Sequence, residues 1–191
     1  MTTDDAAADV TMHELLMRLL GEFSHLQDYL DELVAKRFLE VRIPAASKFF
    51  TDRAIKRIKD EERADLLLAI AKDLNSDAAL ASFRAVFNRV KKLRDRCAHS
   101  ARITPGENGV LVIEKSVITW HEQPIERATV SRSELIQAIH ECRWLEAQAA
   151  YVCHSGRLYN QLRLGTVLIE PVKPTERPED WDGVTYRSVD E

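Results

Sequence analysis

The chain has 191 residues, enough for one folded core, and 45% of them are hydrophobic. Its longest nearly continuous apolar run, Leu66–Ala71, is too short to cross a bilayer, so we expect no membrane association. The acidic first ten residues do not resemble a signal peptide. Three cysteines without metal-type spacing favour a reducing, cytoplasmic location over a disulfide framework.

The net charge of −4 hides an uneven distribution of charged residues. Residues 84–102 carry seven lysines and arginines against one acid, Asp95, and residues 48–59 carry five against Asp52. Both ends of the chain are acidic. The basic centre would attract a polyanion despite the acidic total, although a solvated helix face beside acidic neighbours has the same composition.

Helical periodicity dominates the first part of the chain. Thr11 and Glu14 form a capping-box pattern ahead of leucines spaced by three and four residues, which predicts a helix to about Leu39. Pro44 should break this helix, and 45–59 should form a shorter second one.

Two more helices are predicted before the middle of the chain. Asp60 is placed to cap the first, which should stop at 75–76. Ser76 or Asp77 should cap the next, whose buried stripe ends at Leu93 and whose other positions are strongly basic.

The periodicity changes between Arg102 and Val130. A Pro-Gly loop at 105–109 precedes two β-branched runs, 110–114 and 117–120, which predict a small hairpin, and 125–130 predicts a third short strand.

A long last helix is expected after the hairpin. Ser131 and Glu134 repeat the capping-box pattern, and Gly156 is a suitable stop. These elements define a helical domain over 11–165, preceded by a flexible segment at 1–10. The proline-containing acidic segment 166–191 should be extended or disordered and could act as a regulatory element.

Residues 93–99 read Leu-Arg-Asp-Arg-Cys-Ala-His and close the basic helix. An arginine suited to binding phosphate and a histidine that titrates near neutral pH are the two groups that metal-free phosphodiester cleavage needs. Asp95 and His99, four residues apart, share a helix face, and we expect Asp95 to orient His99. Alternatively, they form a surface pair that caps an ordinary helix.

This segment resembles the R-x4-6-H signature of HEPN-domain proteins, with Arg94 as the family arginine, Asp95 at the polar position and His99 as the family histidine. The resemblance implies an all-α, HEPN-like bundle of four to five main helices, with a small β-hairpin inserted after the motif helix. It also implies a homodimeric, metal-independent and cofactor-free endoribonuclease that cleaves RNA by 2′-OH transesterification. Such a protein would act as a toxin or abortive-infection effector with a neutralising antitoxin partner.

The expected functional residues fall into two groups. The catalytic group is Arg94, Asp95 and His99, and flanking RNA phosphates are assigned to Arg89, Lys92, Arg96 and Arg102. Two alternatives stay open. One is a non-catalytic HEPN-like RNA-binding or scaffold module, for which RNA binding would depend on salt without cleavage. The other is a helical dimerisation adaptor without RNA affinity, in which the motif is accidental.

No metal site is expected from the remaining histidines and cysteines. Cys142 and Cys153 share a face of the last predicted helix, but they would lie about 16 Å apart along its axis and could not bind one ion. His140 and His154 are therefore expected on the surface.

Overall fold

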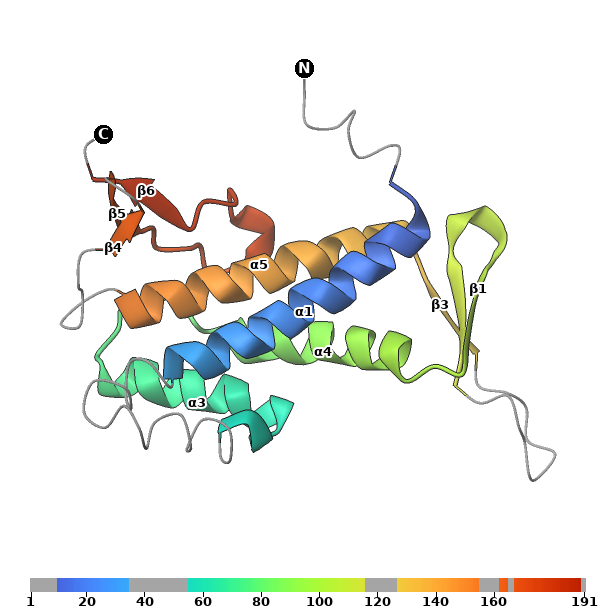
Figure 1. The fold of residues 1–191 in the computed structure, drawn as a ribbon, viewed down its shortest axis with the longest axis horizontal. Coiled ribbons are helices and arrows are strands. Elements are labelled where there is room, and N and C mark those ends of the chain that lie inside the picture. The colour runs from blue at the N-terminus through green and yellow to red at the C-terminus, as the bar shows by residue number, and fades with distance from the viewer. Residues whose placement is uncertain (1–9, 35–54, 116–126, 155–161, 165–166, 190–191) are drawn as a thin grey trace, which may run out of the picture.

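The computed structural model describes residues 10–34, 55–115, 127–154, 162–164 and 167–189. In these residues the long helices are α1 (Met12–Val34), α3 (Asp60–Asp73), α4 (Phe83–Ala98) and α5 (Arg132–His154). They pack into one bundle, with a three-stranded antiparallel sheet beyond the end of α4 and a second one near the end of α5 (Figure 1).

The prediction of an all-α fold is therefore wrong: the described residues are mixed, with two sheets in addition to the helices. The first sheet has the order β1 (Arg102–Pro105), β2 (Leu111–Glu114) and β3 (Arg127–Val130). Its side chains are rich in β-branched residues, which fit a pleated, half-buried surface.

One of the two strands of the predicted hairpin is present in the described residues, as β2. β2 pairs with β1 across the Pro-Gly loop, in the register Ile103 opposite Ile113. The run 117–120, predicted as its partner, lies outside the described residues. The third predicted strand is confirmed, because β3 pairs with β2. Asn108 and Gly109 both take positive φ values in the connecting loop, which glycine and asparagine adopt at little cost.

The capping boxes predicted at the starts of α1 and α5 are confirmed. The Thr11 hydroxyl accepts from the Glu14 amide at 3.2 Å, while the Glu14 carboxylate accepts from the Thr11 amide at 2.6 Å. Ser131 and Glu134 make the same exchange at 3.2 and 2.7 Å. The starts of α1 and α5 therefore follow from local sequence.

Aromatic side chains fill the space between the long helices. α1 lies beside α5 along most of its length (Figure 1). Phe23, Phe83, Phe87 and Trp144 are fully buried, with ring centroids 5.7 Å apart for Phe23 and Phe87 and 6.2 Å for Phe83 and Trp144. Contacts of this kind add to the large apolar area that each ring removes from water.

Two helix boundaries differ from expectation. Of the predicted helix 45–59, the described part contains only a short 3-10 turn, η3 (Ile55–Arg57). α4 begins at Phe83 rather than at 76 or 77. The Asp77 carboxylate accepts hydrogen bonds from Tyr151 and Lys173 at 2.8 Å each, so it ties this segment to α5 and the C-terminal region instead of capping a helix.

The C-terminal segment also differs from the predicted extended or disordered arm. β4 (Leu162–Leu164), β5 (Val167–Pro171) and β6 (Tyr186–Ser188) form the second sheet. The turn η6 (Pro178–Asp180) and the buried Trp181 pack beside α5, where the Trp144 indole donates to the Thr175 carbonyl at 3.0 Å. Prolines prevent a helix in this segment, but they do not prevent burial.

None of the helices in the described part of the chain is long and apolar enough to span a membrane.

Replacing Trp181 with alanine tests whether the C-terminal segment belongs to the core. Trp181 is 8% exposed, so removing its ring should lower the free energy of unfolding by about 3 kcal/mol. Urea denaturation measures this change. Val184→Ala, at a position 39% exposed, is the control and should cost less than about 0.5 kcal/mol. Equal, small effects of the two variants would contradict a packed C-terminal segment.

Candidate functional site

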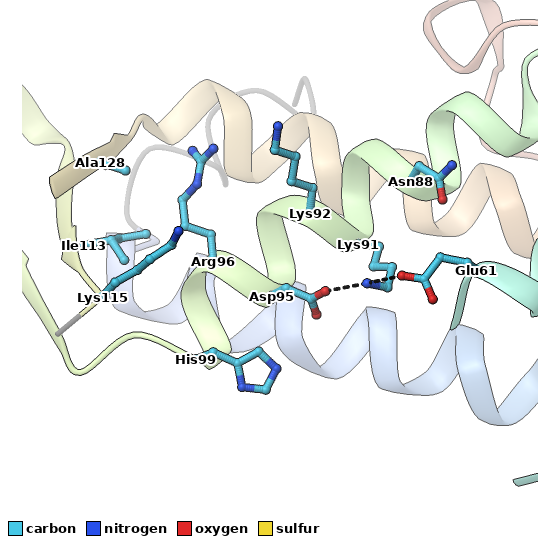
Figure 2. Close-up of a pocket in the computed structure, with 10 residues that line it drawn as sticks. All are labelled: Glu61, Asn88, Lys91, Lys92, Asp95, Arg96, His99, Ile113, Lys115 and Ala128. Atoms are coloured by element: carbon cyan, nitrogen blue, oxygen red, sulfur yellow. Dashed lines mark hydrogen bonds and ion pairs between the residues drawn. The ribbon is translucent and has the colours of Figure 1, made fainter. Parts of the chain in front are cut away.

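The motif residues lie at the end of α4, where the helix turns into β1. The His99 amide donates to the Asp95 carbonyl at 3.0 Å, and the Ser100 hydroxyl donates to the Cys97 carbonyl at 2.7 Å. The Ala101 amide then joins the sheet by donating to the Glu114 carbonyl at 2.8 Å. These bonds fix the turn and leave the His99 side chain exposed at the helix end (Figure 2).

Arg94 is held by protein groups on several sides. It donates to Asp60 at 2.7 Å and lies 3.0 Å from an Asp95 carboxylate oxygen. Its guanidinium carbon lies 4.4 Å from the centre of the Phe23 ring, and the side chain is 17% exposed. An RNA phosphate would have to compete with two carboxylates for this cation.

Asp60, at the start of α3, is the centre of a partly buried charge network. Besides Arg94, its carboxylate accepts from Gln27 of α1 and from Arg63 at 2.6 Å. Arg63 in turn makes two hydrogen bonds of 2.9 Å to the buried Asp31 of α1. The network joins α1, α3 and α4, and Arg94 is its contribution from α4.

The Asp95 carboxylate makes no hydrogen bond or ion pair with the His99 ring, contrary to expectation. Its carboxylate accepts from Lys91 at 2.7 Å and pairs with Arg94, while Lys91 also pairs with Glu61 at 2.9 Å. The two acids raise the pKa of Lys91, with Asp95 contributing most. Among the described residues the His99 ring has no hydrogen-bond partner, so neither the orienting pair nor the alternative surface pair is present.

Two cavities meet at His99. One, of about 530 Å³, has both Arg94 and His99 among its lining residues, so the structure does bring the two motif residues to a common space. The other, of about 700 Å³, lies between α4 and the first sheet (Figure 2). Its lining residues are Glu61, Asn88, Lys91, Lys92, Asp95, Arg96, His99, Ile113, Lys115 and Ala128.

Most of the cations of α4 are neutralised within the fold. Arg84 pairs with Asp65, and Arg89 makes hydrogen bonds of 2.6 and 3.1 Å to Glu141, a carboxylate that is only 2% exposed. Arg89 therefore compensates a buried charge and is a poor candidate for RNA binding.

Three of the predicted RNA-binding residues lack such partners. Within the described residues, Lys92, Arg96 and Arg102 have no salt bridge to a carboxylate, and Lys92 and Arg96 line the larger cavity. The positive charge of α4 that is left without a salt bridge therefore borders the larger cavity, which His99 also lines.

The described residues contain no group of three His, Cys, Asp or Glu side chains that could hold a metal ion. His140 contacts the Pro178 carbonyl at 2.7 Å, and Cys142 is buried. Burial also raises the pKa of the Cys97 thiol, which makes it a poor nucleophile despite its place in the motif.

Comparisons with known proteins add no assignment: no family model, no curated protein and no solved structure matches this chain. The HEPN resemblance therefore rests on the residues around Arg94 and His99.

Sequence reasoning missed several residues that shape the site. Asp60 and Phe23 are far from the motif in sequence, and no local pattern links them to Arg94. Asn88 had a detectable signal, because it lies on the same face of α4 as Lys92.

The network around Asp60 should matter more for stability than an exposed pair. Asp60→Ala leaves Arg63 and Arg94 without a shared carboxylate, and because Asp60 is 18% exposed we expect a loss of about 2 kcal/mol. Asp65→Ala, which breaks a pair more than half exposed, is the matched control and should cost below about 0.5 kcal/mol. Chemical denaturation compares the two, and a smaller loss for Asp60→Ala than for Asp65→Ala would contradict the structural role of Arg94.

Proposed function

We propose that this protein is an endoribonuclease that cleaves RNA by attack of the 2′-hydroxyl on the adjacent phosphate, without a metal ion. The observation that carries the proposal is the exposed His99 imidazole, which lines a cavity of about 700 Å³ together with Lys92 and Arg96, two cations without a salt bridge in the described residues. A proton carrier and a phosphate-binding surface thus share one space.

In the proposed reaction, an imidazole removes the 2′-hydroxyl proton and the oxygen forms a new bond to phosphorus. The bond from phosphorus to the 5′ oxygen breaks, and this oxygen takes a proton from a second acid. The products are a 2′,3′-cyclic phosphate and a 5′-hydroxyl. Lys92 and Arg96 would offset the charge on the phosphoryl oxygens, while Arg94 would hold the end of α4 in place.

The reaction needs a base and an acid together, and among the described residues the larger cavity at His99 is lined by one histidine. A two-fold homodimer whose α4 ends face each other would supply a second His99, so that one imidazole starts neutral and the other charged. We therefore propose a homodimer as the working unit. An acidic antitoxin could neutralise such a toxin by covering the same cations.

Cleavage should persist in EDTA and disappear in His99→Ala, because the mechanism uses imidazole rather than a metal-bound nucleophile. Incubation of purified protein with labelled RNA, and a chemical test for a 2′,3′-cyclic phosphate end, measure this. His13→Ala removes an exposed histidine from α1 and is the control, with activity expected to be unchanged. Activity that survives His99→Ala in protein free of contaminants would refute the mechanism.

A second candidate function is RNA binding without cleavage. It is favoured by the two carboxylates that neutralise Arg94, because the motif arginine is then not available to stabilise a transition state. In that case the wild-type protein and His99→Ala would bind RNA equally, and neither would cleave it.

Both candidates predict which cations set RNA affinity. Lys92→Gln and Arg96→Gln should each weaken binding and flatten the slope of log affinity against log salt by about 0.7, the value for one lost phosphate contact on a single strand. Arg84→Gln removes an already paired cation from the same helix and should leave the slope nearly unchanged. Fluorescence anisotropy at several salt concentrations distinguishes them. Equal effects from Arg84→Gln and Arg96→Gln would place the RNA elsewhere.

A further inference from the structure

Three side chains on one side of α4 stand between two cavities. Asn88, Lys92 and Arg96 follow one another at intervals of four residues, about 6 Å along the helix axis. All three line both the cavity of about 700 Å³ and a second cavity of about 420 Å³ between α4 and α5. They form a ridge, here named the 88–92–96 ridge, with space on either side for groups larger than a phosphate.

The ridge is aligned with the proposed catalytic residue. Asn88 and His99 are eleven residues apart, and eleven residues close three helical turns to within about 20°. His99 caps the end of α4, about 16 Å from Asn88 along the helix axis, and both side chains line the larger cavity. An RNA strand that places a phosphate beside His99 and then runs along α4 through this cavity passes Arg96 and Lys92 before it reaches Asn88.

Asn88 is the uncharged member of the ridge. It is exposed, and within the described residues its carboxamide has no hydrogen-bond partner. The uncharged carboxamide of Asn88 cannot neutralise a phosphate and so releases no counterions from a nucleic acid. Attraction to phosphate therefore does not explain an asparagine at this position. It offers a donor and an acceptor side by side, the arrangement that recognises a base edge.

The cavities beside the ridge can accept flat, partly apolar groups. Ile113 and Ala128 of the first sheet contribute apolar lining to the larger cavity. Val90, Leu93 and Ala138 contribute to the smaller one. Bases splayed out of a single strand combine such apolar contact with hydrogen bonds at their edges.

We propose that Asn88 is a specificity-determining residue that reads an unpaired adenine in an RNA strand laid along α4. Adenine is the favoured base because its amino group stands next to a ring-nitrogen acceptor on both exposed edges, so the carboxamide can pair with either edge. Lys92 and Arg96 hold the intervening phosphates without regard to sequence. The inference rests on the proposed function for RNA as the ligand and for His99 as the mark of the scissile bond.

The test measures binding rather than cleavage. His99→Ala protein, which cannot turn over the substrate, is titrated with labelled homopolymers of adenylate, cytidylate and uridylate of equal length, and affinity is followed by anisotropy. We expect the adenylate strand to bind about tenfold more tightly than the others. Adding Asn88→Ala should abolish this preference without changing the salt slope, and Asn88→Gln should retain part of it.

Lys92→Gln is the matched control in the same background. It should weaken binding to all three strands equally and flatten the salt slope, because a phosphate contact carries no base information. Absence of an adenylate preference, or a preference that survives Asn88→Ala, overturns the inference. If adenylate is preferred but wild-type protein cleaves no RNA, the proposed nuclease fails while the role of Asn88 stands.

Discussion

The ion pair between Arg94 and Asp60 is the contact on which the arrangement of the site depends. A guanidinium packed on a buried phenylalanine ring loses much of its hydration, which is costly unless carboxylates replace the water. Asp60 and Asp95 provide this compensation. Asp60 also accepts a hydrogen bond from Arg63, which in turn donates to Asp31 of α1. The end of α4, and with it the turn at His99, is thereby fixed relative to α1 and α3.

The same principle explains where positive charge remains available. A basic helix cannot pack against three other elements unless most of its inward-facing charges are paired, and Glu141, Glu61 and Asp60 provide partners from α5 and α3. Lys92 and Arg96 have no salt bridge in the described residues, and their side chains line the two cavities beside α4. An acidic protein can in this way retain a confined basic surface.

The additional β-structure is part of the same organisation. The first sheet continues directly from the motif helix, and Ile113 from β2 closes one side of the larger cavity. At the other end, the C-terminal segment supplies the Thr175 carbonyl, which accepts from both Trp144 and the fully buried Gln148. A backbone carbonyl from the far end of the chain thus provides a hydrogen-bond acceptor for two buried N–H donors of α5.

Sequence alone determined the elements whose signals are local. The capping boxes at Thr11 and Ser131 and the spacing of apolar residues after them defined α1 and α5, because both depend on residues within one or two turns. The β-branched run at 125–130 likewise predicted β3. The tertiary structure alone decided the partner of each group: β1 and β3 on either side of β2, Tyr151 and Lys173 on Asp77, and Asp60 on Arg94, 34 residues away. Pairing of strands and charges depends on which surfaces packing brings together, and no local pattern records that.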